Sequence, residues 1–132
     1  FTNCCFDILH AGHVDYLERA KRHGDLLVLG LNSDESVRKL KGNSRPINNQ
    51  YARAKVLSGL SAIDYIVIFS GSTPISLIEV FQPTIHVKGG DYKKEALPEY
   101  NIIQSYGGKI IIEPFIDGFS TTNIIKRMNN DN

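Results

Sequence analysis

The chain has 132 residues, 42% of them hydrophobic, and carries 15 Lys and Arg against 14 Asp and Glu. This length suits one domain with its own core. The balanced charge offers no basic field for long nucleic acid, so we expect no nucleic-acid partner. No run approaches the ~20 apolar residues of a membrane span. The adjacent Cys4 and Cys5 suit reduced thiols, so we expect a cytoplasmic protein without a membrane partner.

Short apolar runs alternate with amphipathic segments along the chain, which predicts alternating strands and helices. In chain order we expect strand 1–6, helix 11–23, strand 25–31, helix 50–61, strand 65–69, helix 73–81, strand 85–87, helix 97–106, strand 109–112, a helix from about Ser120, and a frayed tail over 129–132. This order predicts an α/β fold, with a single doubly wound, Rossmann-like, five-stranded parallel sheet and helices on both faces. Because the chain begins inside a predicted strand without Met, we expect residues 1–132 to be one domain of a longer polypeptide.

Ligands of such sheets bind beyond the carboxyl ends of the strands. The segment His10-Ala11-Gly12-His13 lies there, between the first predicted strand and the first helix. The unpaired N–H groups and the dipole of a helix start stabilise an anion. Gly12 permits close approach of a ligand, and His10 and His13 can donate to phosphate. The alternative is that one histidine caps the helix and the other packs at the turn.

Cations of two further segments are candidates for the same site. Residues 39–46 form a basic loop that resembles a mobile lid, and Lys41 could neutralise triphosphate charge; the alternative is a solvated surface loop. Arg53 lies near the start of the helix over 50–61, where a cation opposes the dipole. A ligand phosphate or a carboxylate such as Asp64 would hold it, and at an exposed position it would need no partner.

Three more groups of residues follow predicted strands. Gly89-Gly90-Asp91-Tyr92, with Lys88 before it, could hold a nucleoside, or it could be an ordinary turn. A hydroxyl of Ser120 or Thr121 should cap the last helix, and the same helix start could bind phosphate. Asp7 could bind Mg²⁺ or the acceptor, or serve as a turn or capping residue.

With these motifs in view, the chain resembles the nucleotidyltransferase superfamily with the H-x-G-H signature over nearly its whole length. Segments 6–13, 32–34, 40–42, 44–48, 87–92 and 120–126 are most similar to the bacterial adenylyltransferases that act on D-glycero-β-D-manno-heptose 1-phosphate. That family makes ADP-heptose for the lipopolysaccharide core. Its members occur as separate proteins or as the carboxyl-terminal domain of a bifunctional kinase and adenylyltransferase, and commonly form dimers or larger assemblies.

The resemblance implies that the sugar phosphate attacks the α-phosphorus of ATP, with Mg²⁺, and expels pyrophosphate. His10 and His13 would stabilise the pentacoordinate phosphorus and Lys41 the bridging or acceptor phosphate. Arg53 and residues 120–122 would hold the β and γ phosphates, and Asp91 and Tyr92 would flank the nucleoside. The implied nucleotide-binding residues are Thr2, Asn3, Cys4, Phe6, Gly12, Arg53, Lys88, Gly89, Asp91, Tyr92, Ser120, Thr121 and Thr122. Cys4 stands where the family commonly has Gly.

Two other functions fit parts of the pattern. A cytidylyltransferase acting on glycerol 3-phosphate or a similar small phosphate would share the histidine motif and the Ser-Thr-Thr segment. A regulatory domain would bind the nucleotide without turnover. The presence of both histidines, with Lys41 and Arg53, argues against the regulatory domain.

Overall fold

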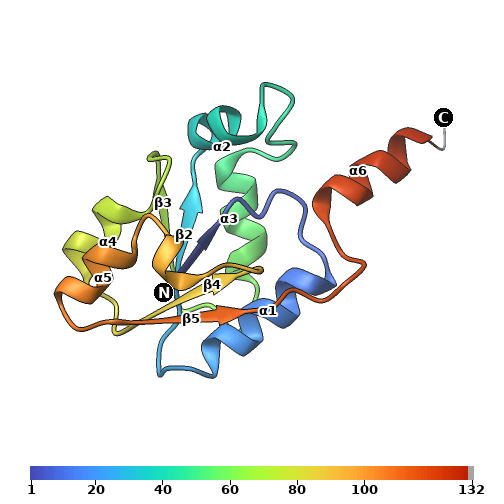
Figure 1. The fold of residues 1–132 in the computed structure, drawn as a ribbon. Helices are drawn as coiled ribbons and strands as arrows, with labels where there is room; N and C mark the ends of the chain where they lie inside the picture. The colour runs from blue at the N-terminus through green and yellow to red at the C-terminus, as the bar shows by residue number, and fades with distance from the viewer. Residues whose placement is uncertain (131–132) are drawn as a thin grey trace.

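The computed structural model describes residues 1–130 as alternating parallel strands and helices (Figure 1). The strands are β1 (Thr2–Cys4), β2 (Val28–Asn32), β3 (Tyr65–Phe69), β4 (Ile85–Gly89) and β5 (Lys109–Glu113). The α-helices are α1 (Ala11–Lys21), α2 (Asp34–Lys41), α3 (Gln50–Ser58), α4 (Ile75–Phe81), α5 (Tyr100–Ser105) and α6 (Thr121–Asn130), with a 3₁₀ turn η1 at Lys94–Ala96. The predicted α/β class is confirmed.

The strand pairing divides into two parallel ladders, β1–β2–β3 and β4–β5. Phe1 bridges them: its amino group donates to the Ile85 carbonyl and the Val87 amide donates to the Phe1 carbonyl, both at 2.8 Å. The prediction of a single five-stranded sheet is therefore met only in part. β1 is only three residues long. Among the described residues, the backbone hydrogen bonds that join this end of the chain to β4 are those of Phe1, which precedes β1.

Helices pack on both faces of the strands because β2 is apolar on both sides. Leu29 and Leu31 belong to a buried cluster with Leu17 of α1 and Leu57 of α3. A second cluster contains Val28 of the same strand together with residues of α4 and α5, namely Ile78 and Ile103. All five residues of β2 are buried. The core therefore lies in two layers around the central strands, and the loops at their carboxyl ends are left to form a site.

Several element bounds differ from the predictions for local reasons. Helix α2 was not predicted; the Ser33 hydroxyl caps its start, and Gly42, with φ 98°, ends it. The basic loop thus begins as the last turn of a helix. The helix predicted over 97–106 starts later because Leu97 precedes Pro98 and is extended, with ψ 139°. Strand β4 continues through Gly89.

The two ends of the chain also differ from the predictions. The strand expected over residues 1–6 is confined to Thr2–Cys4. The expected frayed tail is helical through Asn130, and positions 131 and 132 lie outside the described residues. Figure 1 shows α6 projecting away from the strands, and the helix has no buried residue. Within the described residues, no helix is long and apolar enough to cross a membrane.

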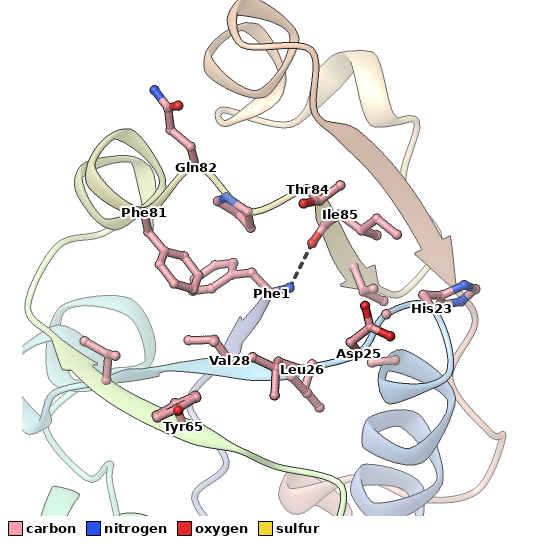
Figure 2. Close-up of a pocket in the computed structure, with 16 residues that line it drawn as sticks. Phe1, His23, Asp25, Leu26, Val28, Tyr65, Phe81, Gln82, Thr84 and Ile85 are labelled. Atoms are coloured by element: carbon pink, nitrogen blue, oxygen red, sulfur yellow. Dashed lines mark hydrogen bonds between the residues drawn. The ribbon is translucent and has the colours of Figure 1, made fainter.

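A large cavity lies at the amino ends of the strands. It is a groove of about 730 Å³ whose walls are mainly apolar, and Figure 2 shows Phe1 within it between Val28 and Ile85. Because ligands of parallel α/β sheets bind at the carboxyl ends of the strands, this groove is on the wrong side for the predicted chemistry.

Candidate active site

A cleft of about 270 Å³ opens at the carboxyl end of β1, between the β1–α1 turn, the end of α2 and the β5–α6 loop. Ten of the predicted site residues line it, namely Cys4, Phe6, Asp7, His10, Gly12, His13, Lys41, Ser120, Thr121 and Thr122. Five residues that were not assigned to the site complete its walls, namely Cys5, Arg45, Phe115, Ile116 and Phe119. The fold thus assembles a site from segments more than 100 positions apart.

The two histidines form a stacked pair at the start of α1. Their ring centroids are 3.7 Å apart and their planes differ by 18°. The His10 amide donates to His13 Nδ1 at 3.3 Å, so the proton of a neutral His13 ring is on Nε2. His10 Nδ1 is buried and has no hydrogen-bond partner among the described residues. The pair therefore retains hydrogen-bonding capacity for a ligand.

Both histidines are held in the neutral form. Burial, and then the proximity of His10, lowers the pKa of His13 to about 4. Burial also lowers the pKa of His10. A bound phosphate would oppose both effects because a negative charge favours the imidazolium. The pair can thus present neutral donors to a ligand or gain positive charge as negative charge accumulates nearby.

Close packing fixes the position of these rings. A Cβ at Gly12 would lie 3.0 Å from Phe119 Cβ and 3.1 Å from His10 Cε1, so glycine makes room for both side chains. Phe6 meets His13 edge to face, with centroids 5.1 Å apart. Phe6 also has φ 45°, a strained conformation for a bulky residue. Strain at this position fits a turn that places the two histidines.

The start of α6 forms the opposite wall of the cleft. The predicted cap is confirmed, since the Ser120 hydroxyl accepts from the Asn123 amide at 3.0 Å. The Thr121 hydroxyl donates to the Ile8 carbonyl at 3.1 Å and ties this helix start to the β1–α1 turn. Lys41, the last residue of α2, lines the cleft from a third side and is exposed. Cations and helix-start N–H groups thus surround one small volume, as an anionic ligand requires.

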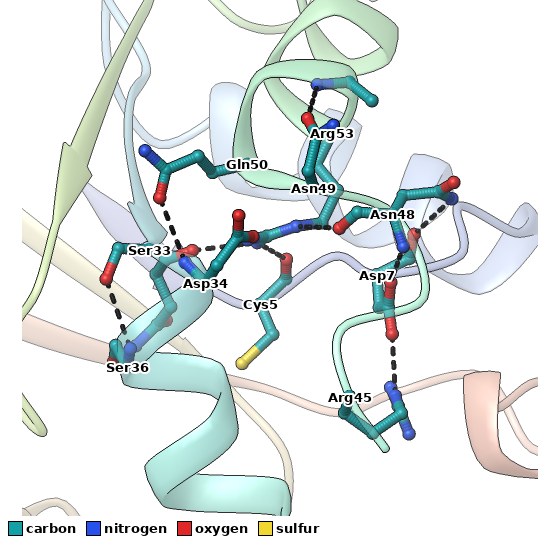
Figure 3. A network of polar contacts seen from close by, with 12 residues as sticks. Cys5, Asp7, Ser33, Asp34, Ser36, Arg45, Asn48, Asn49, Gln50 and Arg53 are labelled. Atoms are coloured by element: carbon teal, nitrogen blue, oxygen red, sulfur yellow. Dashed lines mark hydrogen bonds and ion pairs between the residues drawn. The ribbon is translucent and has the colours of Figure 1, made fainter. Parts of the chain in front are cut away.

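Asp7 anchors the basic loop (Figure 3). Its buried carboxylate accepts from Arg45 Nε at 2.6 Å, from the Ile47 amide at 2.9 Å and from the Asn48 amide at 3.0 Å. Burial by itself would raise the pKa of Asp7, but these three donors outweigh it and lower the pKa. The residues from Arg45 to Asn48 are therefore held in place, whereas a mobile lid stays a prediction for the rest of the segment 39–46.

The donor set of the cleft does not form a cage for a metal ion. Both carboxylate oxygens of Asp7 already accept hydrogen bonds. Within residues 1–130, no three His, Cys, Asp or Glu residues gather as a metal site. Mg²⁺ commonly binds through substrate phosphates and keeps several waters. The residues present thus suit Mg²⁺ carried on a nucleotide better than a resident ion.

Arg53 lies in a hydrogen-bond network beside the cleft rather than in the cleft wall (Figure 3). Its guanidinium donates to the carbonyls of Asn48, Cys5 and Asn32 at 2.7–2.9 Å and to Asp34 Oδ1 at 2.8 Å. A guanidinium has five N–H donors, so four are in use. The carboxylate partner is Asp34, not Asp64, whose carboxylate pairs with Lys21. Binding of phosphate by Arg53 stays a prediction, for which one N–H of this buried side chain is left.

The remaining predicted site residues lie outside the cleft walls. Thr2 is buried and hydrogen-bonds Tyr16 at 2.6 Å, while Asn3 Oδ1 is buried without a partner among the described residues. Lys88 faces Glu99, with 3.4 Å between Nζ and Oε1. The structure places Gly89, Asp91 and Tyr92 at or beyond the end of β4, outside the lining of the cleft.

Sequence reasoning gave no role to the aromatic residues of the β5–α6 loop. The Phe119 ring is stacked on the His10 ring, with centroids 6.2 Å apart. Phe115 lines the cleft and is 51% exposed. A signal was present in the sequence. Phe115, Ile116 and Phe119 are large apolar residues in a loop just before a helix start, where polar residues are the rule.

The fold and this cleft define a nucleotidyltransferase domain. The chain belongs to the cytidylyltransferase-like family, whose model matches residues 1–127. It is 55% identical over 128 residues to the bifunctional protein HldE of Syntrophotalea carbinolica and 54% identical to that of Geobacter metallireducens. Each alignment covers 97% of this chain and 26% of the relative, so the chain spans about a quarter of the length of these relatives.

Two solved structures share the fold. A lipopolysaccharide core biosynthesis protein from Thermoplasma volcanium is 27% identical, with a TM-score of 0.68, covering 87% of this chain and 93% of that protein. A pantothenate synthetase from Thermus thermophilus, 14% identical, has a TM-score of 0.65 and covers 93% of this chain and 59% of that one. At that identity the second likeness concerns the fold alone.

Proposed function

We propose that this domain transfers an adenylyl group from ATP to D-glycero-β-D-manno-heptose 1-phosphate, giving ADP-heptose and pyrophosphate for the lipopolysaccharide core. The observation that carries the proposal is the stacked His10–His13 pair, which presents unused hydrogen-bonding groups at the start of α1. The identity of more than half of the aligned residues with the HldE proteins supports the choice of substrates.

In the proposed reaction an oxygen of the sugar phosphate attacks the α-phosphorus of ATP. A new P–O bond forms as the bond to the bridging oxygen breaks, and the electron pair leaves with pyrophosphate. His10 and His13 stabilise the charge on the pentacoordinate phosphorus. Lys41 and the helix start at residues 120–122 hold the flanking phosphates, and Mg²⁺ enters with the nucleotide as its complex. The attacking group is already an anion, so catalysis depends on position and charge and needs no strong general base.

Other features of the proposal concern the whole protein. The domain would work in the cytoplasm next to a sugar kinase domain in the same polypeptide, as the resemblance implies and as the name "bifunctional" of its relatives suggests. A homodimer stays a prediction. So does contact of the nucleotide with Lys88, Asp91 and Tyr92.

A nucleotide and acceptor screen tests the proposal. The purified domain with Mg²⁺, ATP and heptose 1-phosphate should release pyrophosphate and form ADP-heptose, detected by mass spectrometry. CTP with glycerol 3-phosphate should give neither product. Pyrophosphate release from the CTP pair alone would replace the adenylyltransferase with the cytidylyltransferase. Nucleotide binding without release from any pair would favour the regulatory domain.

A further inference from the structure

Phe115 is an exposed aromatic ring in the wall of the cleft. It follows β5, is 51% exposed, and has Tyr16 behind it with ring centroids 5.6 Å apart. Tyr16 is itself fixed, because its hydroxyl donates to the Val87 carbonyl at 3.1 Å and hydrogen-bonds Thr2 at 2.6 Å. A rigid buried ring therefore supports Phe115 from one side and leaves much of its surface open.

The two glycines after β4 make room for aromatic rings. A Cβ on Gly89 would lie 2.5 Å from Phe115 Cζ, a distance that no real side chain tolerates. A Cβ on Gly90 would lie 2.8 Å from Tyr92 Cε2 and 3.6 Å from Phe115 Cε2. Phe115 and Tyr92 thus converge on the Gly89–Gly90 turn, and Tyr92 is 53% exposed. The space that the sequence assigned to a ligand near these glycines is bordered by two rings.

The same loop connects this aromatic pair to the histidines. Phe119, four residues after Phe115, lies near His10 with centroids 6.2 Å apart. A nucleotide with its phosphates at His10 and His13 would therefore find Phe115 along the same wall of the cleft. Exposed aromatic faces bind nucleobases by stacking, and a purine offers a larger face than a pyrimidine.

We infer that Phe115 is the platform on which the purine base of the nucleoside triphosphate stacks, with Tyr92 as a second ring beside it. This inference rests on the proposed function and makes Phe115 a residue that favours a purine over a pyrimidine substrate. The opposite possibility is that the Phe115 ring fills the place of the base and hinders binding. The two differ in the sign of the effect of removing the ring.

Steady-state kinetics of Phe115→Ala decide between them. Loss of one base–aromatic stack should raise KM for ATP about 5- to 100-fold and leave kcat within about threefold. The preference for ATP over CTP should fall, and Phe115→Trp should retain the KM of the unaltered protein. Tyr51→Ala is a matched control, because Tyr51 is 73% exposed on α3 and does not line the cleft. An unchanged or lower KM in Phe115→Ala overturns the inference.

Binding of 1,N⁶-etheno-ATP gives a readout that does not need turnover. Its fluorescence should be quenched by stacking in the unaltered protein and not in Phe115→Ala. Gly89→Ala should displace the ring and raise KM for ATP, and most of this increase should vanish in the Phe115→Ala background, where only the 3.0 Å approach to Tyr16 Cε2 remains. If the unaltered protein neither binds the probe nor turns over ATP, the proposed function fails, and this inference with it. If it does both and Phe115→Ala matches it, the inference alone fails.

Discussion

Two groups of polar residues lie side by side at the carboxyl end of β1, and they differ in how fully their hydrogen bonds are made. In the network around Arg53 and Asp7, four guanidinium donors and both carboxylate oxygens are in use. In the cleft, His10 Nδ1 has no partner among the described residues. The groups of the network are almost fully paired and hold the loops together, whereas the unpaired atom of His10 remains available to a ligand. Residue type alone does not distinguish the two roles.

Arg53→Leu should give the largest effect, on stability. Removal of the guanidinium leaves Asp34 and three carbonyls without their partner, which should cost about 3–5 kcal/mol. Urea denaturation measures the change, and Arg22→Leu, at an exposed position, is the control. If the variant keeps its stability but no longer binds ATP, Arg53 binds phosphate rather than stabilising the network.

His13→Ala should act on turnover instead. Loss of one hydrogen-bond donor to the oxygens of the reacting phosphoryl group should lower kcat by about 10²-fold or more, while the protein still folds and binds ATP. Pyrophosphate release and a thermal melt give the two measurements. His23→Ala, which removes a hydrogen bond to Glu113 outside the cleft, is the control for turnover. An unfolded His13→Ala protein would show that the packing of Phe6 against this ring matters more than its chemistry.

Asp7→Asn tests whether the carboxylate is structural. The amide cannot accept from all three donors, so the free energy of unfolding should fall by about 1–3 kcal/mol. The Mg²⁺ concentration that gives half-maximal activity should not change, because the ion enters with the nucleotide. A large increase in that concentration would instead identify Asp7 as a metal ligand.

The smallest expected effect is on the pH dependence of stability, which should differ between the histidines of the cleft and the network around Asp7. The pKa of His13 is about 4 in the folded protein and near 6.5 when unfolded. The unfolded chain therefore takes up a proton first, and stability should decrease as the pH falls from about 6.5 to 4. The lowered pKa of Asp7 makes stability fall further at still lower pH, because the carboxylate of the unfolded chain is protonated before that of the folded protein. Because burial also lowers the pKa of His86, the informative quantity is the shallower slope of His13→Ala relative to the parent.

Local apolar patterns predicted most of the fold. The strand over 65–69 matches β3, and the cap by Ser120 follows from residue type alone. Helix α2 was missed because it is short and buries only Ser36 and Val37, too few positions to set a helical period. The division of the sheet was not predicted because it depends on the contact between Phe1 and β4. These residues are far apart in the sequence, and no local pattern indicates the contact.

The site was predictable where a motif supplies it and not where the fold does. The histidine motif fixes both rings within one turn of a helix, so sequence alone placed them correctly in the cleft. The partners of Arg53 are backbone carbonyls that only the folded chain brings together. Phe115 was missed because it has no periodic pattern, and its environment is set by Tyr16 and Gly89 from distant elements.

The hydrogen bond from Thr121 to the Ile8 carbonyl joins positions 113 residues apart. A ribosome makes the histidine turn early and the start of α6 last, so a growing chain carries one wall of the cleft without the other until the end of this domain emerges. Closing the long loop between Ile8 and Thr121 costs conformational entropy, and only the completed core offsets this cost. The cleft is therefore a late product of folding, because it exists only once the start of α6 has joined the turn between β1 and α1.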